Sequence, residues 1–92
     1  MKNASIRMRA ARESFLLLNP NSKKSSHEVA KEIAACRGVR KVFITSGEFG
    51  FVVSTAEEKS ADIEDVSRRV RKSIGIGKAK AVKSHYVYTK TR

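Results

Sequence analysis

The first half of the chain shows a short apolar run followed by a helical repeat of apolar positions. Residues 15–18, Phe-Leu-Leu-Leu, are stopped by Asn19-Pro20-Asn21, which predicts a strand and then a turn. Ser25 and Glu28 have the spacing of a capping box, in which the two side chains satisfy backbone amides at a helix start. Apolar residues then recur at steps of four and three before a glycine that can end a helix: Val29, Ile33, Cys36 and Gly38. The pattern predicts a helix over about residues 26–37.

The second half of the chain contains a hairpin and a second helix. Residues 39–45 are β-branched and aromatic, residues 46–48 have the composition of a turn, and residues 49–54 are apolar again, which predicts two antiparallel strands. Apolar positions at helical spacing then lead to two glycines: Ile63, Val66, Val70, Ile74, Gly75 and Gly77. A last strand is predicted from about residue 80 to residue 88.

The order of the predicted elements is therefore βαββαβ. Strand–helix–strand crossovers are right-handed, so the two halves interleave into a four-stranded antiparallel sheet with both helices on one face. We predict an α+β protein with the ferredoxin-like fold.

The sheet face without helices is predicted to be apolar. Strand 49–54 places Phe49, Phe51 and Val53 on one side, and the strand at residues 15–18 is apolar on both sides. An apolar face of this kind needs a second cover, which is either another subunit or a planar ligand such as a nucleic-acid base. The candidate residues of a dimer interface are Phe49, Phe51 and Val53.

Positive charge adds a possible anionic partner to this picture. The 92 residues include 20 Lys+Arg and 9 Asp+Glu, which gives a formal net charge of +11 at pH 7. Most of the excess lies in the acid-free ends, so we expect residues 1–12 to be a basic N-terminal tail and residues 13–92 to form one domain. A basic surface favours sequence-independent binding of nucleic acid, but basic surfaces also occur on proteins that bind no nucleic acid. The candidate contacts are Arg7, Arg9, Arg12, Lys78, Lys80 and Lys83.

Residues that carry catalysis or bind metals are sparse. Cys36 and His27 are nine positions apart, which at about 100° per residue places them on opposite sides of the first helix. Two histidines and one cysteine are too few for a structural zinc site, and the segment 75–78 lacks the residues of a Walker motif. We expect no enzymatic activity, no metal and no cofactor. The lone cysteine and the lack of a long apolar run favour a cytoplasmic protein without a membrane partner.

Residues 27–53 carry a family resemblance. Their helix, the Gly38-Val39 step, the β-branched strand and the hairpin sequence Thr-Ser-Gly-Glu-Phe-Gly-Phe-Val-Val at 45–53 resemble the ligand-binding RAM module of the Lrp/AsnC transcription regulators. The second helix and its glycine exit fit the same pattern, so the resemblance covers about residues 13–90. In full regulators this module follows a winged helix-turn-helix domain, for which the 92 residues leave no space. The resemblance therefore implies a stand-alone version.

This resemblance also implies a function linked to transcription regulation. The bare sheet face would pack on a second subunit, dimers would assemble into rings such as octamers, and a small effector, commonly an amino acid, would bind between dimers near the hairpin turn. A full-length Lrp/AsnC regulator is a further implied partner. The family usually has an effector-site aspartate where this chain has Gly50, so the existence and identity of an effector stay open. The candidate effector-binding residues are Ser46, Gly47, Glu48, Phe49 and Gly50.

An RNA recognition motif is the alternative with the same order of elements. Residues 49–52, Phe-Gly-Phe-Val, match the middle of its third-strand consensus. Gly47, Glu48 and Ser54 stand where that consensus has a basic residue, a glycine and its last aromatic residue. Binding of RNA or single strands is therefore the second hypothesis.

Overall fold

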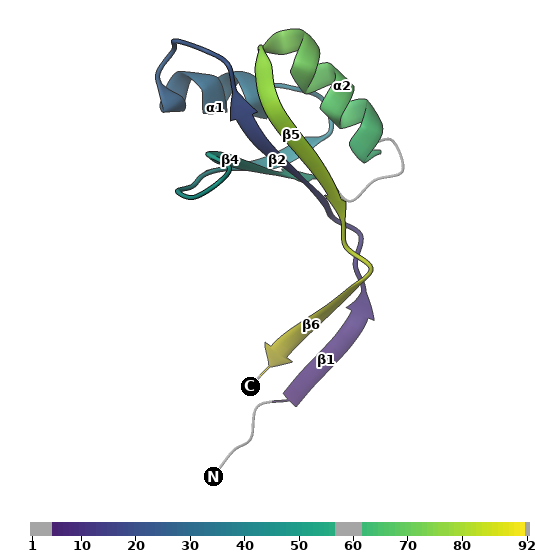
Figure 1. Ribbon diagram of the computed structural model, residues 1–92. Coiled ribbons are helices and arrows are strands. Elements are labelled where there is room, and N and C mark those ends of the chain that lie inside the picture. Colours follow the sequence, from purple (N-terminus) through teal and green to yellow (C-terminus); the bar gives the residue numbers. More distant parts are fainter. Residues whose placement is uncertain (1–4, 57–61, 92) are drawn as a thin grey trace.

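A computed structural model describes residues 5–56 and 62–91 of the chain. Four of its strands form one antiparallel sheet, in the spatial order β3 (Val39–Ile44), β4 (Phe51–Thr55), β2 (Ser14–Pro20) and β5 (Ile76–Lys83). The helices α1 (Ser26–Ala34) and α2 (Ile63–Ser73) cover the same face of this sheet (Figure 1). The prediction of a ferredoxin-like α+β fold is confirmed.

Side-chain caps explain where the two helices begin. Ser25 Oγ accepts a hydrogen bond from the Glu28 amide, which is one half of the predicted capping box; the Glu28 carboxylate accepts from the Ser25 hydroxyl in place of the Ser25 amide. Asp62 caps α2 by accepting a hydrogen bond from the Glu64 amide. Helix α1 ends at Ala34, a few residues before the predicted end, and Gly38 then adopts a positive φ of 91° in the turn that leads into β3.

The hydrophobic core lies between the two helices and one face of the sheet. Strand β2 pairs with both β4 and β5, so residues directly opposite each other point to the same face. Leu16 lies opposite Val53, and Leu18 lies opposite Phe51. The buried core is made up of Leu16, Leu18, Val29, Ile33, Phe51, Val53, Ile63, Val66, Val70 and Ile74.

The assignment of Phe51 and Val53 to an uncovered dimer interface is wrong. Both side chains belong to the core beneath the helices and are only 7% and 0% exposed. The alternation along a strand separates its residues into two sets, but it does not say which set faces the helices. Phe49, the third candidate, precedes β4 and lies in the turn that connects β3 to β4.

The N-terminal segment also differs from the predicted tail. Residues Ser5–Ala10 form strand β1, which pairs antiparallel with β6 (Tyr86–Thr91). These two strands make a separate two-stranded ribbon that extends away from the helices (Figure 1). The last strand predicted over residues 80–88 is therefore divided into β5 and β6.

The two neighbouring leucines of β2 provide a test of which sheet face is covered. Leu16 is buried in the core, so Leu16→Ala should lower the free energy of unfolding by about 2 to 5 kcal/mol. Leu17 points to the opposite face and is half-buried, so Leu17→Ala should cost about 1 kcal/mol in the monomer. Urea unfolding followed by circular dichroism at low protein concentration measures both. Equal losses would contradict the face assignment.

Candidate functional site

The face of the sheet opposite the helices is apolar along its middle. The register places five apolar side chains there, and we call them the uncovered face: Phe15, Leu17, Phe43, Val52 and Val82. Phe43 and Val82 are 47% and 37% exposed. Lys80 lies opposite Leu17 and Lys41 lies opposite Ser54, so lysines stand on the outer strands beside this apolar band. An apolar band with a charged border is typical of a surface that docks on another macromolecule.

Ser54 lies among these residues with an unusual hydroxyl group. Its side chain is opposite Phe15 in the register and is 1% exposed. Among the described residues, Ser54 Oγ has no hydrogen-bond partner. Buried hydroxyl groups in folded proteins nearly always have a partner, so this hydroxyl carries an energetic cost in the chain as described.

The ribbon of β1 and β6 is amphipathic. Its register places apolar and aromatic side chains on one face, and each of them is more than half exposed: Ile6, Met8, Tyr86 and Tyr88. Arg7 and Arg9 point to the other face. A two-stranded ribbon on its own is marginally stable in water, so these exposed side chains favour a further layer that covers them.

The candidate effector residues form the turn between β3 and β4, and this turn is tied to the end of β2. The Asn19 side chain donates a hydrogen bond from Nδ2 to the Glu48 carbonyl (2.6 Å) and accepts one at Oδ1 from the Gly50 amide (2.8 Å). Thr45 closes the turn, since its hydroxyl donates to the Phe49 carbonyl and its amide donates to the Gly50 carbonyl. Gly47 has a positive φ of 122°, a conformation that favours glycine.

Glu48 and Lys78 give this turn paired opposite charges. Lys78 Nζ lies 3.0 Å from the Glu48 carboxylate and 5.4 Å from the centre of the Phe49 ring. The hydrogen bond from Lys78, together with its positive charge, lowers the pKa of Glu48. Both side chains are largely exposed, so the ion pair adds little to stability and remains accessible to a ligand.

The predicted nucleic-acid contacts do not share one surface. Arg7 and Arg9 lie on the polar face of the ribbon, whereas Lys78 and Lys80 belong to the uncovered side of the sheet. Lys83 points to the opposite side of β5 from Lys80, because the two are an odd number of residues apart. Arg12 lies in the connection between β1 and β2. Net charge therefore does not by itself predict a basic patch.

Sequence reasoning missed the side chains that the structure exposes most clearly. Phe43 and Val82 were missed because the candidate interface residues all came from strand 49–54, although the strand at residues 15–18 was also predicted to be apolar on both sides. Ile6 and Met8 alternate with Arg7 and Arg9, which is a strand signal that the positive charge of the segment masked. Within residues 5–56 and 62–91, no three His, Cys, Asp or Glu side chains are grouped so that they could hold a metal ion. In the same ranges, none of the helices has the length and apolar character needed to cross a membrane.

Several solved structures resemble this fold. The hypothetical protein PHS023 from Pyrococcus horikoshii has 17% sequence identity and a TM-score of 0.59, and the match covers 84% of this chain and 87% of that protein. FFRP-DM1, an Lrp-family structure, has 18% identity and a TM-score of 0.59 and matches over 84% of this chain and 96% of its own. PH0061 has 12% identity and a TM-score of 0.56, and the match spans 76% of this chain and 49% of that protein. No family model and no curated protein sequence matches the chain. The similarities therefore establish a shared fold, which is compatible with a RAM module.

The ion pair at the turn has a pH dependence that can be measured. Because the pKa of Glu48 is lowered, the pair is intact above the ordinary glutamate pKa of about 4.3 and is lost as pH falls through the lower folded value. We expect the Glu48 carboxyl carbon to titrate by NMR at a lower pH than an ordinary glutamate. In Lys78→Met its midpoint should rise toward the ordinary value. An unchanged midpoint would show that Lys78 does not contact Glu48 in solution.

Proposed function

We propose that the protein is a non-enzymatic oligomerisation and effector-binding module that takes part in transcription regulation. The observation that carries this proposal is the uncovered face, an apolar sheet surface on a fold shared with an Lrp-family structure. The effector class that we propose is a free amino acid. The two parts of the proposal depend on different residues, so they can be tested separately.

Oligomerisation is supported by the chemistry of the uncovered face. Phe15, Leu17 and Val52 occupy the central strands, and Phe43 and Val82 extend the apolar band to the outer strands. Packing this band against the same band of a second copy would remove apolar surface from water on both copies. The lysines at its border would remain solvated, since long side chains keep their charged ends in water. Such dimers would then assemble into larger rings.

Binding of an amino acid is supported by the charges at the β3–β4 turn. An amino acid carries one carboxylate and one ammonium group, and Glu48 and Lys78 present the two opposite charges side by side. In the described parts of the chain, the hydrogen bonds of the turn use the Gly50 amide but not the amides of Gly47 and Glu48. Those two amides can donate to a carboxylate. Gly50 has no carboxylate, so Glu48 would supply the acidic group that binds the ammonium group of the amino acid.

The RNA-binding alternative gains no support from the sheet. In that motif, aromatic rings on the exposed face of the central strands stack on bases. Here Phe51 faces the helices, and the exposed side of β4 carries Val52 and Ser54. Of the aromatic residues in the two central strands, Phe15 alone lies on the uncovered side, whereas the RNA-binding motif uses several stacking rings there.

Charging the uncovered face should separate the subunits. Phe43→Lys places a cation in the apolar band next to Val52, and because Phe43 is almost half exposed, the substitution should leave the monomer folded. We expect the dimer to be weakened by about 2 kcal/mol or more, which is the size of an interface hot spot. Sedimentation velocity at moderate salt gives the native mass, and circular dichroism checks the fold.

A matched substitution controls for charge alone. Ala35→Lys adds the same charge at the exposed end of α1, on the helix side of the sheet, and should leave the native mass unchanged. A wild-type protein that sediments as a monomer at micromolar concentration would refute the oligomerisation proposal. A mass that is unaffected by Phe43→Lys would refute the proposed interface.

Effector binding can be tested by thermal stabilisation. The common amino acids, added one at a time at about 10 times their dissociation constant, should raise the unfolding free energy by about 1.4 kcal/mol for any that binds. Glu48→Gln should abolish the response because the ammonium group of the ligand loses its partner. Glu64→Gln removes the same charge from α2 and should leave the response intact. No response to any amino acid at millimolar concentration would refute this part of the proposal, whatever the oligomeric state.

A further inference from the structure

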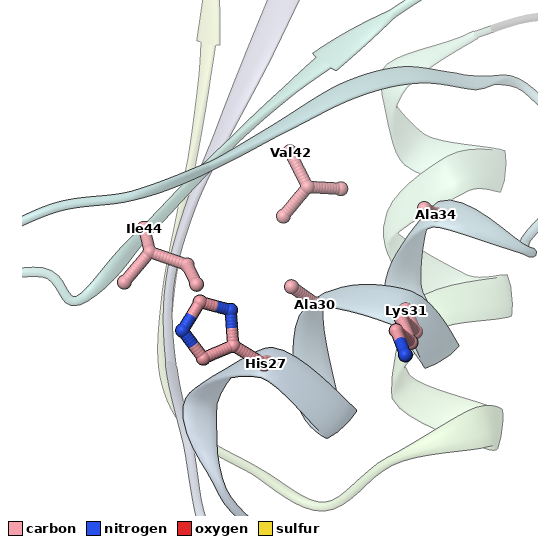
Figure 2. A pocket seen from close by; sticks show the side chains of 6 residues that line it. All are labelled: His27, Ala30, Lys31, Ala34, Val42 and Ile44. Carbon is pink, nitrogen blue, oxygen red and sulfur yellow. The ribbon is translucent and has the colours of Figure 1, made fainter.

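A hollow separates helix α1 from the outer strand β3, on the helix side of the sheet. It has a volume of about 350 Å³ and is lined by His27, Ala30, Lys31, Ala34, Val42 and Ile44. Figure 2 shows that His27, Ala30 and Lys31 reach it from α1, and that Val42 and Ile44 reach it from β3. Its floor is apolar, since the two alanines and the β-branched residues supply most of it. We call this hollow the edge groove.

The edge groove lies beside an unpaired strand edge. Among residues 5–56 and 62–91, strand β3 is the last strand on its side of the sheet and pairs with β4 alone. The Thr45 amide bonds to the Gly50 carbonyl, so the alternation of an antiparallel ladder makes Phe43 the next residue bonded to β4. Val42 and Ile44 therefore direct their backbone N–H and C=O groups away from the sheet. The same two residues line the groove with their side chains.

In the described part of the chain, the second half of this edge has none of the features that usually protect an outer strand. Natural proteins place charges, prolines or a covering segment on such edges. Arg40 and Lys41 charge the start of β3, but the following residues Val42, Phe43 and Ile44 are apolar, and Ile44 is 45% exposed. An added strand would both bond to this edge and place its side chains over the groove.

The charge around the edge groove selects one type of occupant. Lys31 forms no ion pair with the described residues, and the groove has no acidic residue in its lining. Lys41 lies on the same strand, and its side chain points to the other face of the sheet. A strand added beside β3 would direct every second side chain to the face on which Lys41 lies, so acidic residues at those positions would meet positive charge.

We propose that the edge groove binds an extended acidic peptide of a partner protein, which adds a fifth strand beside β3. The peptide backbone bonds to the outward groups of Val42 and Ile44. Its side chains alternate: the apolar ones enter the groove between Ala30 and Ala34, and the acidic ones lie on the opposite face of the sheet, beside Lys41. Recognition by strand addition uses main-chain bonds for affinity and pockets at alternate positions for specificity.

A second copy of the same chain is a poorer occupant. Pairing two β3 edges would bring Lys31, Arg40 and Lys41 of both copies to one interface, and like charges disfavour such contacts. The formal net charge of +11 acts in the same direction. This site is separate from the uncovered face, so it does not depend on the proposed dimer.

The test uses the full chain and a labelled, end-capped hexapeptide in which aspartate and valine alternate. Fluorescence anisotropy at moderate salt measures its binding. A block peptide, with all its valines before all its aspartates, has the same composition without the alternation, and a peptide of alternating lysine and valine has the opposite charge. We expect the alternating acidic peptide to bind at least about tenfold more tightly than either control, because only it bonds to the edge, fills the groove and places acidic side chains beside Lys41.

Two pairs of variants locate the site on the protein. Ala34→Leu fills the groove and should abolish binding, whereas Ala35→Leu makes the same change at a position outside the lining and should not. Lys41→Glu should weaken binding by about fivefold or more, and Lys72→Glu, which carries the same charge change on α2, by less than about twofold. Both alanines are exposed, so neither variant should unfold the chain.

Three results would overturn the proposal. Equal binding of the block peptide would show that acidic charge alone is recognised. Equal effects of Lys41→Glu and Lys72→Glu would show a nonspecific attraction. Absence of peptide binding, together with a native mass that falls in Ala34→Leu, would show that a second copy covers this edge.

Discussion

Strand β2 is a central strand with apolar side chains on both of its faces. Leu16 and Leu18 point to the helices, and Phe15 and Leu17 point away from them, so one short segment is apolar on both sides. Both helices lie over the same face, which leaves the second set of side chains without a layer from the described chain. In ordinary antiparallel sheets one face is polar and faces water. The proposal of an external layer therefore starts from the composition of a single strand.

Most of the fold could be predicted from the sequence because the period of apolar residues changes clearly between strands and helices. The capping box at Ser25 and the helical spacing that ends in Val70 each correspond to an observed feature. The two faces of β4 could not be assigned in the same way, because alternation is symmetrical until the partners across the strand are known. The Leu16–Val53 pair breaks that symmetry, and it exists only in the folded sheet.

The candidate sites show a similar limit. The sequence predicted the residues of the β3–β4 turn, but it assigned Asn19 only to the turn that follows the first strand. It holds the Glu48 and Gly50 backbone groups because the end of β2 lies next to the start of β4, across about 30 residues of sequence. The edge groove is still harder to predict, since His27 and Ile44 belong to elements that meet only through the packing of α1 on β3.

The ribbon has a consequence for the order in which the protein folds. Thr91 donates a hydrogen bond to the Ser5 carbonyl across a separation of 86 residues, nearly the length of the chain. Closing so long a loop costs entropy before any contact is gained, unless the intervening chain is already compact. We therefore expect the sheet and helices to form first and to bring the two segments together. Strands β1 and β6 can then pair, starting at Ala10 and Tyr86 and ending at Ser5 and Thr91. The ribbon is accordingly the last part of the protein to form and the first to open.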